Sequence, residues 1–168
     1  MNIREVLQSE HSKRQTLAIV EYIGNDEAKF RELVEIFLEG EYRLTQRSVW
    51  SFSYCVEKYP HLVEPYLEIL IAQLERNNAH DSVKRNIVRM LQFIEIPEDL
   101  LGKIYSVCLD FIDNPKEPVA TRAFAISVAA KIAKPEPDLI RELQLVVNKH
   151  LKYSSAAFKS RANKVLSL

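Results

Sequence analysis

Apolar residues recur at every third or fourth position along most of the chain, which is the spacing of one buried face of an α-helix. The clearest stripe lies between residues 97 and 113, where the apolar positions are Leu101, Ile104, Tyr105, Cys108, Leu109 and Ile112. No stretch alternates apolar and polar residues with the period of two that is typical of β-strands. We therefore predict an all-α fold.

Breaks in this pattern predict about nine to ten helices in antiparallel pairs. Glycine, proline and asparagine separate the apolar stretches, and these residues end helices or cannot continue them. Gly24 and Gly40 are expected to end the helices that precede them, and Asn77 with Asn78 to form a turn. The expected helices span residues 3–8, 12–23, 26–39, 43–58, 62–76, 81–94, 97–113, 117–133, 137–152 and 155–168.

One stretch, DSVKRNIVRMLQFI at residues 81–94, shows a pattern that returns along the chain. It reads as an amphipathic helix with Arg85 near its start. The same pattern occurs around four further arginines, and the five are spaced 33, 38, 37 and 39 residues apart: Arg14, Arg47, Arg85, Arg122 and Arg161. One helix pair cannot bury its apolar faces alone, so neighbouring pairs are expected to stack into a continuous core.

A single repeat can be read in residues 99–134, DLLGKIYSVCLDFIDNPKEPVATRAFAISVAAKIAK. A leucine-rich helix is followed by an Asp/Pro-containing turn and then by the arginine-bearing helix. This arrangement resembles the HEAT repeat family, which is related to the armadillo-like arrays. The resemblance covers one domain, 1–168, with a partial unit at 1–24 and full units at about 25–59, 60–96, 97–134 and 135–168. It implies a right-handed α-α superhelix, a solenoid whose arginine-bearing helices line the concave side.

The repeated arginines have two interpretations. In the HEAT family the arginine often pairs with an acidic residue just before it. Here an acidic residue four positions before the arginine exists only in two units, as Glu10 before Arg14 and Asp81 before Arg85. The arginines could therefore be structural, bonding to helix ends or to carbonyls of the adjacent repeat, or they could form a working basic groove.

Charge is unevenly distributed although 23 basic and 23 acidic residues balance to zero. The arginine-bearing helices carry a net charge of +10 and their full-length partner helices −8. A concave face lined by the arginine-bearing helices would attract anionic partners. Each arginine and the residues four and seven positions after it are predicted to share one exposed helix face. These residues are Arg47, Ser51 and Tyr54 in one unit and Arg85, Arg89 and Gln92 in the next. Trp50 is expected at the border between core and groove.

These patterns predict a non-catalytic scaffold that binds a protein or peptide of acidic character. Interface anchors favour Trp, Tyr and Arg. The expected partner-binding residues are Arg47, Trp50, Tyr54, Arg85, Arg89 and Arg122. Self-association through the C-terminal helix is a further hypothesis, because Val165, Leu166 and Leu168 leave that end of the stack apolar.

Nucleic-acid binding through the same groove is the alternative function. The chain resembles the HEAT-like alkylpurine DNA glycosylases, which use a basic concave groove with aromatic side chains and an aspartate. It departs from them in having one tryptophan, Trp50, and no aspartate on the predicted concave positions except Asp81 at a helix start. Phosphates would then contact the arginines, and bases would stack on Trp50 or Tyr54.

No catalytic, cofactor or metal site is expected. The four histidines are scattered, and HExxH, CxxC, Gly-x-Ser-x-Gly and Walker patterns are absent from the sequence. Cys55 and Cys108 are isolated in apolar helix patterns, which indicates buried thiols in a reducing compartment. No apolar run approaches the ~20 residues of a membrane span, and the start MNIREVLQSE lacks a secretory signal. We therefore expect a cytoplasmic protein that makes no membrane contact.

Overall fold

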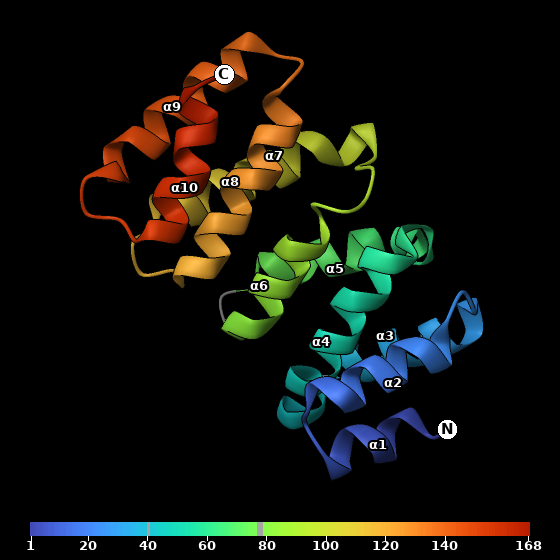
Figure 1. The fold of residues 1–168 in the computed structure, drawn as a ribbon. Coiled ribbons are helices and arrows are strands. Elements are labelled where there is room, and N and C mark those ends of the chain that lie inside the picture. Colours follow the sequence, from blue (N-terminus) through green and yellow to red (C-terminus); the bar gives the residue numbers. More distant parts are fainter. Residues whose placement is uncertain (40, 77–78) are drawn as a thin grey trace. The chain divides into compact units, whose positions relative to one another are not determined.

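The computed structural model describes residues 1–39, 41–76 and 79–168. The predicted helix end at Gly40 and the predicted turn at Asn77 and Asn78 lie outside these residues. Within the described ranges the regular elements are ten α-helices and one 3-10 helix, with no strand (Figure 1). The all-α prediction is confirmed.

The chain divides into two compact units, Met1–Gln73 and Leu74–Leu168. The first holds α1 (Ile3–Ser9), α2 (Lys13–Ile23), α3 (Glu27–Leu38), α4 (Tyr42–Lys58), η1 (Pro60–Tyr66) and nearly all of α5 (Leu67–Leu74). The second holds α6 (Asp81–Met90), α7 (Glu98–Asp113), α8 (Val119–Ala133), α9 (Pro137–Leu151) and α10 (Ala156–Leu166). The boundary falls inside the expected repeat 60–96, and the single domain 1–168 stays a prediction.

Short polar side chains fix where several helices begin. Asp26 Oδ1 accepts hydrogen bonds from the backbone N–H groups of Ala28 and Lys29, at 3.0 and 3.1 Å, and so caps α3. Ser12 and Ser155 cap α2 and α10 in the same way. Each cap satisfies donors that have no partner within the helix, which stabilises that helix by about 1 kcal/mol.

Two helices differ from the predicted boundaries by more than two residues at one end. The expected helix 62–76 is a 3-10 helix up to Tyr66, and α5 begins only at Leu67. Pro65 explains the difference, because it has no N–H to donate and disfavours helical geometry in the residue before it. The expected helix 81–94 ends at Met90, and the backbone then forms i→i+3 hydrogen bonds as far as Phe93.

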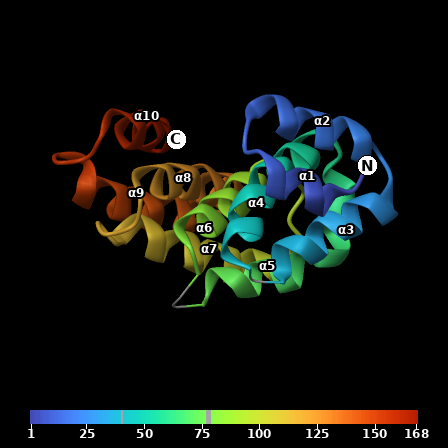
Figure 2. The same ribbon diagram turned by 90° about the horizontal axis from the view of Figure 1, so that it is seen from below.

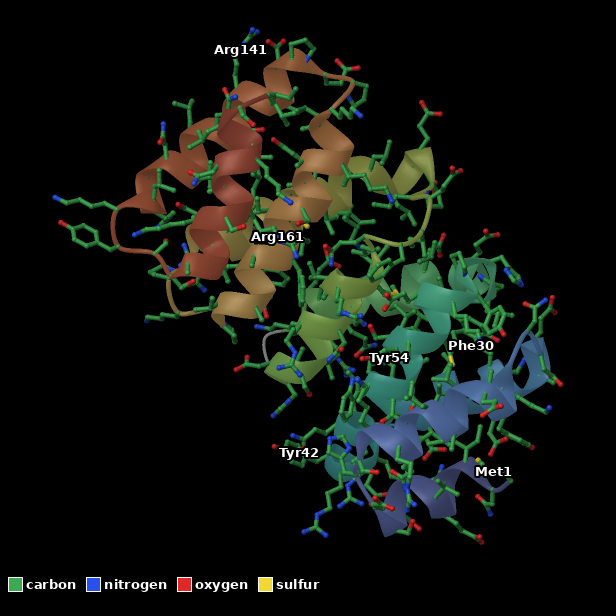
Figure 3. The ribbon with its side chains drawn as sticks, in the orientation of Figure 1. Met1, Phe30, Tyr42, Tyr54, Arg141 and Arg161 are labelled. Carbon is green, nitrogen blue, oxygen red and sulfur yellow. The ribbon has the colours of Figure 1, made fainter. Side chains whose placement is uncertain are left out.

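Aromatic packing between α3 and α4 forms the centre of the first unit. The Phe30 and Phe37 rings of α3 both stack on Phe52 of α4, with ring centroids 5.6 and 5.5 Å apart. All three side chains are buried, and Figure 3 shows Phe30 on the side of α3 that faces α4. Such pairs contribute about 1 kcal/mol each beyond the area that they bury.

Helix α8 is the centre of the second unit, where it packs against α6, α7, α9 and α10 (Figures 1 and 2). Its buried positions include four alanines, Ala123, Ala125, Ala129 and Ala133. Alanine has no side chain beyond Cβ, so helices on several sides of α8 can approach its backbone closely. A helix that is packed on several sides needs apolar residues on most of its circumference, and α8 has them.

Both cysteines are free and buried, as predicted. Burial raises the pKa of the Cys55 and Cys108 thiols to about 12. Thiolate is the reactive form, so both side chains are packing residues rather than nucleophiles.

Two glycines should respond to alanine with opposite signs. Gly24 ends α2 with φ +53° and ψ −133°, a conformation open almost only to glycine, so Gly24→Ala should lower the free energy of unfolding by about 2 kcal/mol. Gly102 lies in α7 with no atom within 4 Å of an added Cβ, so Gly102→Ala should raise it by about 0.7 kcal/mol. Urea unfolding measures the free energy of unfolding of both variants. A change of the same sign in the two would contradict the conformational roles given to these glycines.

Candidate partner-binding surfaces

Arg47 of α4 holds the end of another helix. One of its Nη atoms donates to the backbone carbonyls of Leu7 and Gln8, each at 2.8 Å. These carbonyls lie in the last turn of α1, where they have no partner within the helix. Arg47 thus follows the structural interpretation of the repeated arginines, although its side chain is still half exposed.

Trp50 and Tyr54 are half-buried on the same face of α4. The Trp50 ring lies between His11 and Tyr54, with ring centroids 5.6 and 6.3 Å away. Trp50 is therefore at the border of the core, as predicted. The prediction that Ser51 shares this face is wrong: Ser51 is fully buried, because the outward face of α4 passes through the positions three and seven after Arg47.

The surface of the first unit is mixed in charge. Four of its basic residues lie near the starts of α2 and α4, namely Lys13, Arg14, Arg43 and Arg47. A hollow of about 480 Å³ between the same helices includes Tyr54, together with Glu21, Glu57 and Lys58. The basic side chains of this unit are therefore near Arg47 and Trp50, whereas Tyr54 lies beside a hollow of mixed charge.

In the second unit, Arg122 is buried, with 8% of its surface exposed. Its Nε and one Nη donate to the Ile112 carbonyl at 3.1 and 2.7 Å, near the end of α7. Its guanidinium also lies 4.6 Å from the centre of the Phe158 ring. Burial lowers the pKa of Arg122, and the side chain joins α7, α8 and α10 instead of facing solvent.

Arg85 and Arg89 lie on the outward side of α6, as predicted; Arg85 is exposed and Arg89 half-buried. The Arg89 guanidinium is 5.4 Å from the centre of the Phe93 ring. Just after α6, Gln92 Oε1 accepts a hydrogen bond from Arg161 of α10 at 3.1 Å. The face of α6 is thereby connected to α10.

Arg161 also donates to Ser127 Oγ of α8, and its guanidinium lies 5.9 Å from the Phe124 ring (Figure 3). Beside it, α8 and α10 enclose a pocket of about 340 Å³. The lining residues are Ile126, Ser127, Ala130, Lys131, Lys134, Arg161, Lys164, Val165 and Leu168. We call this the α8–α10 pocket.

The three arginine-bearing helices of the second unit are strongly basic. Together α6, α8 and α10 hold eight basic side chains and one acidic one, a net charge of +7. The single carboxylate is Asp81, at the first position of α6, and neither α8 nor α10 contains an acidic residue. Lys131 is held by the Leu91 and Ile94 carbonyls after α6, and burial lowers its pKa.

The residues of the α8–α10 pocket were not among the expected partner-binding residues. The sequence contains a signal for them, since the last two arginine-bearing helices have cations but no carboxylates. Their convergence on one pocket depends on the small residues Ser127 and Ala130, which leave space between the helices. Of the three apolar residues at the C-terminal end, Val165 is buried, Leu166 is half-buried and Leu168 is 60% exposed.

Within the described ranges, no group of three or more His, Cys, Asp or Glu side chains is placed to hold a metal ion. The helices in those same ranges also include none with the length and apolar character needed to cross a membrane.

The repeat seen in the sequence is matched by a family model described as a HEAT repeat domain, over residues 3–168. The chain belongs to the HEAT repeat family. HEAT repeats commonly mediate protein interactions, and the family is typically a non-catalytic scaffold. No curated protein and no solved structure matches the chain.

The two classes of arginine should separate in stability measurements. Arg122→Met removes the charged hydrogen bonds to Ile112 and should lower the free energy of unfolding by about 2 kcal/mol. Arg85→Met, at an exposed position, should change it by less than about 0.5 kcal/mol. Equal losses in urea unfolding would show that Arg122 has no special structural role.

Proposed function

We propose that this HEAT repeat protein is a non-catalytic scaffold that binds an acidic segment of another protein through its arginine-bearing helices. The observation that carries the proposal is the charge of α6, α8 and α10, eight cations against one carboxylate. Although Arg122 is buried and Lys84 is paired with Glu117, the field of such a charge excess raises the local concentration of anionic partners and speeds their association. HEAT arrays provide extended surfaces that suit a peptide-like segment.

The proposed contacts are basic or aromatic side chains on the outward faces of the arginine-bearing helices. In the second unit these are Arg85 and Arg89, with Phe93 beside Arg89. In the first unit they are Trp50, Tyr54 and the exposed part of Arg47. Arg122 has no place in the proposal, because its guanidinium is buried against Ile112 and Phe158.

Nucleic acid is the second candidate partner, and the same net charge of +7 favours it. The two partners differ in their dependence on salt. Binding to duplex DNA weakens steeply with salt because condensed counterions are released for each phosphate contact. Binding to an acidic peptide has a shallower dependence, because a short peptide carries no comparable ion atmosphere.

Charge reversal on α6 tests the proposal directly. Arg85→Glu with Arg89→Glu should weaken binding to labelled poly-L-glutamate by at least about tenfold, measured by fluorescence anisotropy. The matched control is Lys116→Glu with Lys152→Glu, which makes the same charge change in the same unit at exposed residues outside the arginine-bearing helices. Equal weakening in both double variants would show that binding depends on net charge and not on Arg85 and Arg89. Binding to a DNA duplex that is tighter than binding to poly-L-glutamate and steeply salt-dependent would favour nucleic acid as the partner.

Tryptophan fluorescence tests the part of the proposal that concerns the first unit. The chain has one tryptophan, and the half-buried Trp50 reports on the outward face of α4. Saturation with poly-L-glutamate should shift its emission, because a bound segment changes the solvent exposure of the indole. Unchanged emission at saturation would place the binding site in the second unit alone.

A further inference from the structure

We propose that the α8–α10 pocket binds one apolar side chain of an acidic peptide, with flanking carboxylates held by Lys134, Arg161 and Lys164. The inference rests on the proposed function and names the site and the kind of sequence that the partner would supply. Poly-L-glutamate would therefore be an incomplete ligand, since it lacks the apolar side chain.

The floor of the pocket is apolar. Ile126 and Ala130 of α8 and Val165 of α10 line it, and no acidic side chain is found among the described lining residues. A volume of about 340 Å³ is at the small end of ligand pockets, which suits a leucine-sized side chain and its neighbouring backbone. Transferring such a side chain out of water would supply the non-ionic part of the affinity.

Among the described residues that line the pocket, Lys134, Arg161 and Lys164 have no carboxylate side chain as a partner. The polar partners of Arg161 are the amide of Gln92 and the hydroxyl of Ser127, which orient the guanidinium without neutralising it. For Lys134, Arg161 and Lys164, no ion pair with a carboxylate is present in the described parts of the chain. An arginine held in this way can donate two parallel hydrogen bonds to a carboxylate.

Helix dipoles do not cancel this charge. Lys134 follows the last turn of α8 and Lys164 lies in the last turn of α10, where the helix ends are negative. Each helix end carries about half an elementary charge, so two ends offset about one of the three cations. The pocket therefore keeps a net positive field over an apolar floor, which matches an acidic peptide with one apolar residue.

Two labelled peptides test the inference, Glu-Asp-Glu-Leu-Asp-Glu-Asp and the same peptide with serine in place of leucine. They have equal charge, so they differ only in the side chain meant for the pocket. The full chain should bind the leucine peptide about fivefold more tightly, measured by fluorescence anisotropy. Equal affinity for the two peptides would overturn the inference while leaving the proposed scaffold function standing.

Three variants locate the site. Lys134→Gln with Lys164→Gln should weaken binding of the leucine peptide about tenfold, since two ionic contacts are lost. The matched control, Lys116→Gln with Lys152→Gln, removes the same charge from exposed residues outside both the pocket lining and the arginine-bearing helices, and it should bind like the unaltered chain. Ala130→Phe fills the pocket without changing the charge and should abolish the preference for leucine over serine.

The remaining outcomes are decisive as well. Circular dichroism checks that each variant folds, and if Ala130→Phe does not, the two lysine double variants still decide the question. Equal affinities in these double variants would place the site elsewhere. Failure of the unaltered chain to bind either peptide would overturn the proposed function together with the inference. Loss of DNA binding but not of peptide binding in Lys134→Gln with Lys164→Gln would assign the pocket to nucleic acid instead.

Discussion

The last carbonyls of every α-helix lack partners within the helix, and a stack of helix pairs must supply donors for them. Among the described residues, long basic side chains from a neighbouring helix do so at the ends of three helices and in the turn after α6. The donors are Arg47 for α1, Lys29 for α2, Lys131 for the turn after α6 and Arg122 for α7. Each one joins two elements, so much of the packing within each unit depends on these contacts.

This requirement divides the basic residues into two groups. In the second unit, Arg122 and Lys131 are occupied by helix ends, and Lys84 forms a largely buried ion pair with Glu117 at 3.0 Å. The cations that remain for a partner are fewer than the net charge of the arginine-bearing helices suggests. Three of them, Lys134, Arg161 and Lys164, line the α8–α10 pocket.

The same division explains why a repeated arginine is an ambiguous signal for function. Arg47, Arg122 and Arg161 occupy equivalent places in the repeat, yet Arg122 is buried while Arg161 lines an open pocket. The difference lies in their neighbours. Arg122 contacts the end of α7 and the Phe158 ring, whereas the described contacts of Arg161 are with the neutral groups of Gln92, Ser127 and Phe124.

Much of the fold could be predicted because its signals are local. Apolar periodicity marked the helices, Gly24 marked the end of α2, and the regular spacing of arginines marked the repeats that the family match supports. The start of α5 was misplaced because Pro65 disfavours α-helical geometry before it, and apolar periodicity does not show this effect. The face assigned to Ser51 was wrong because an even helical wheel does not show which neighbours cover it.

The sequence by itself determined the all-α class, the repeat and the segregation of charge, since these follow from residue types at fixed spacing along one helix. Only the tertiary structure decided which cations meet carbonyls and which meet solvent. That choice depends on helices far apart in sequence, as when Gln92 and Ser127 both contact Arg161. A side chain's spacing within its own helix shows which way it points. What it meets there depends on which helix packs against it.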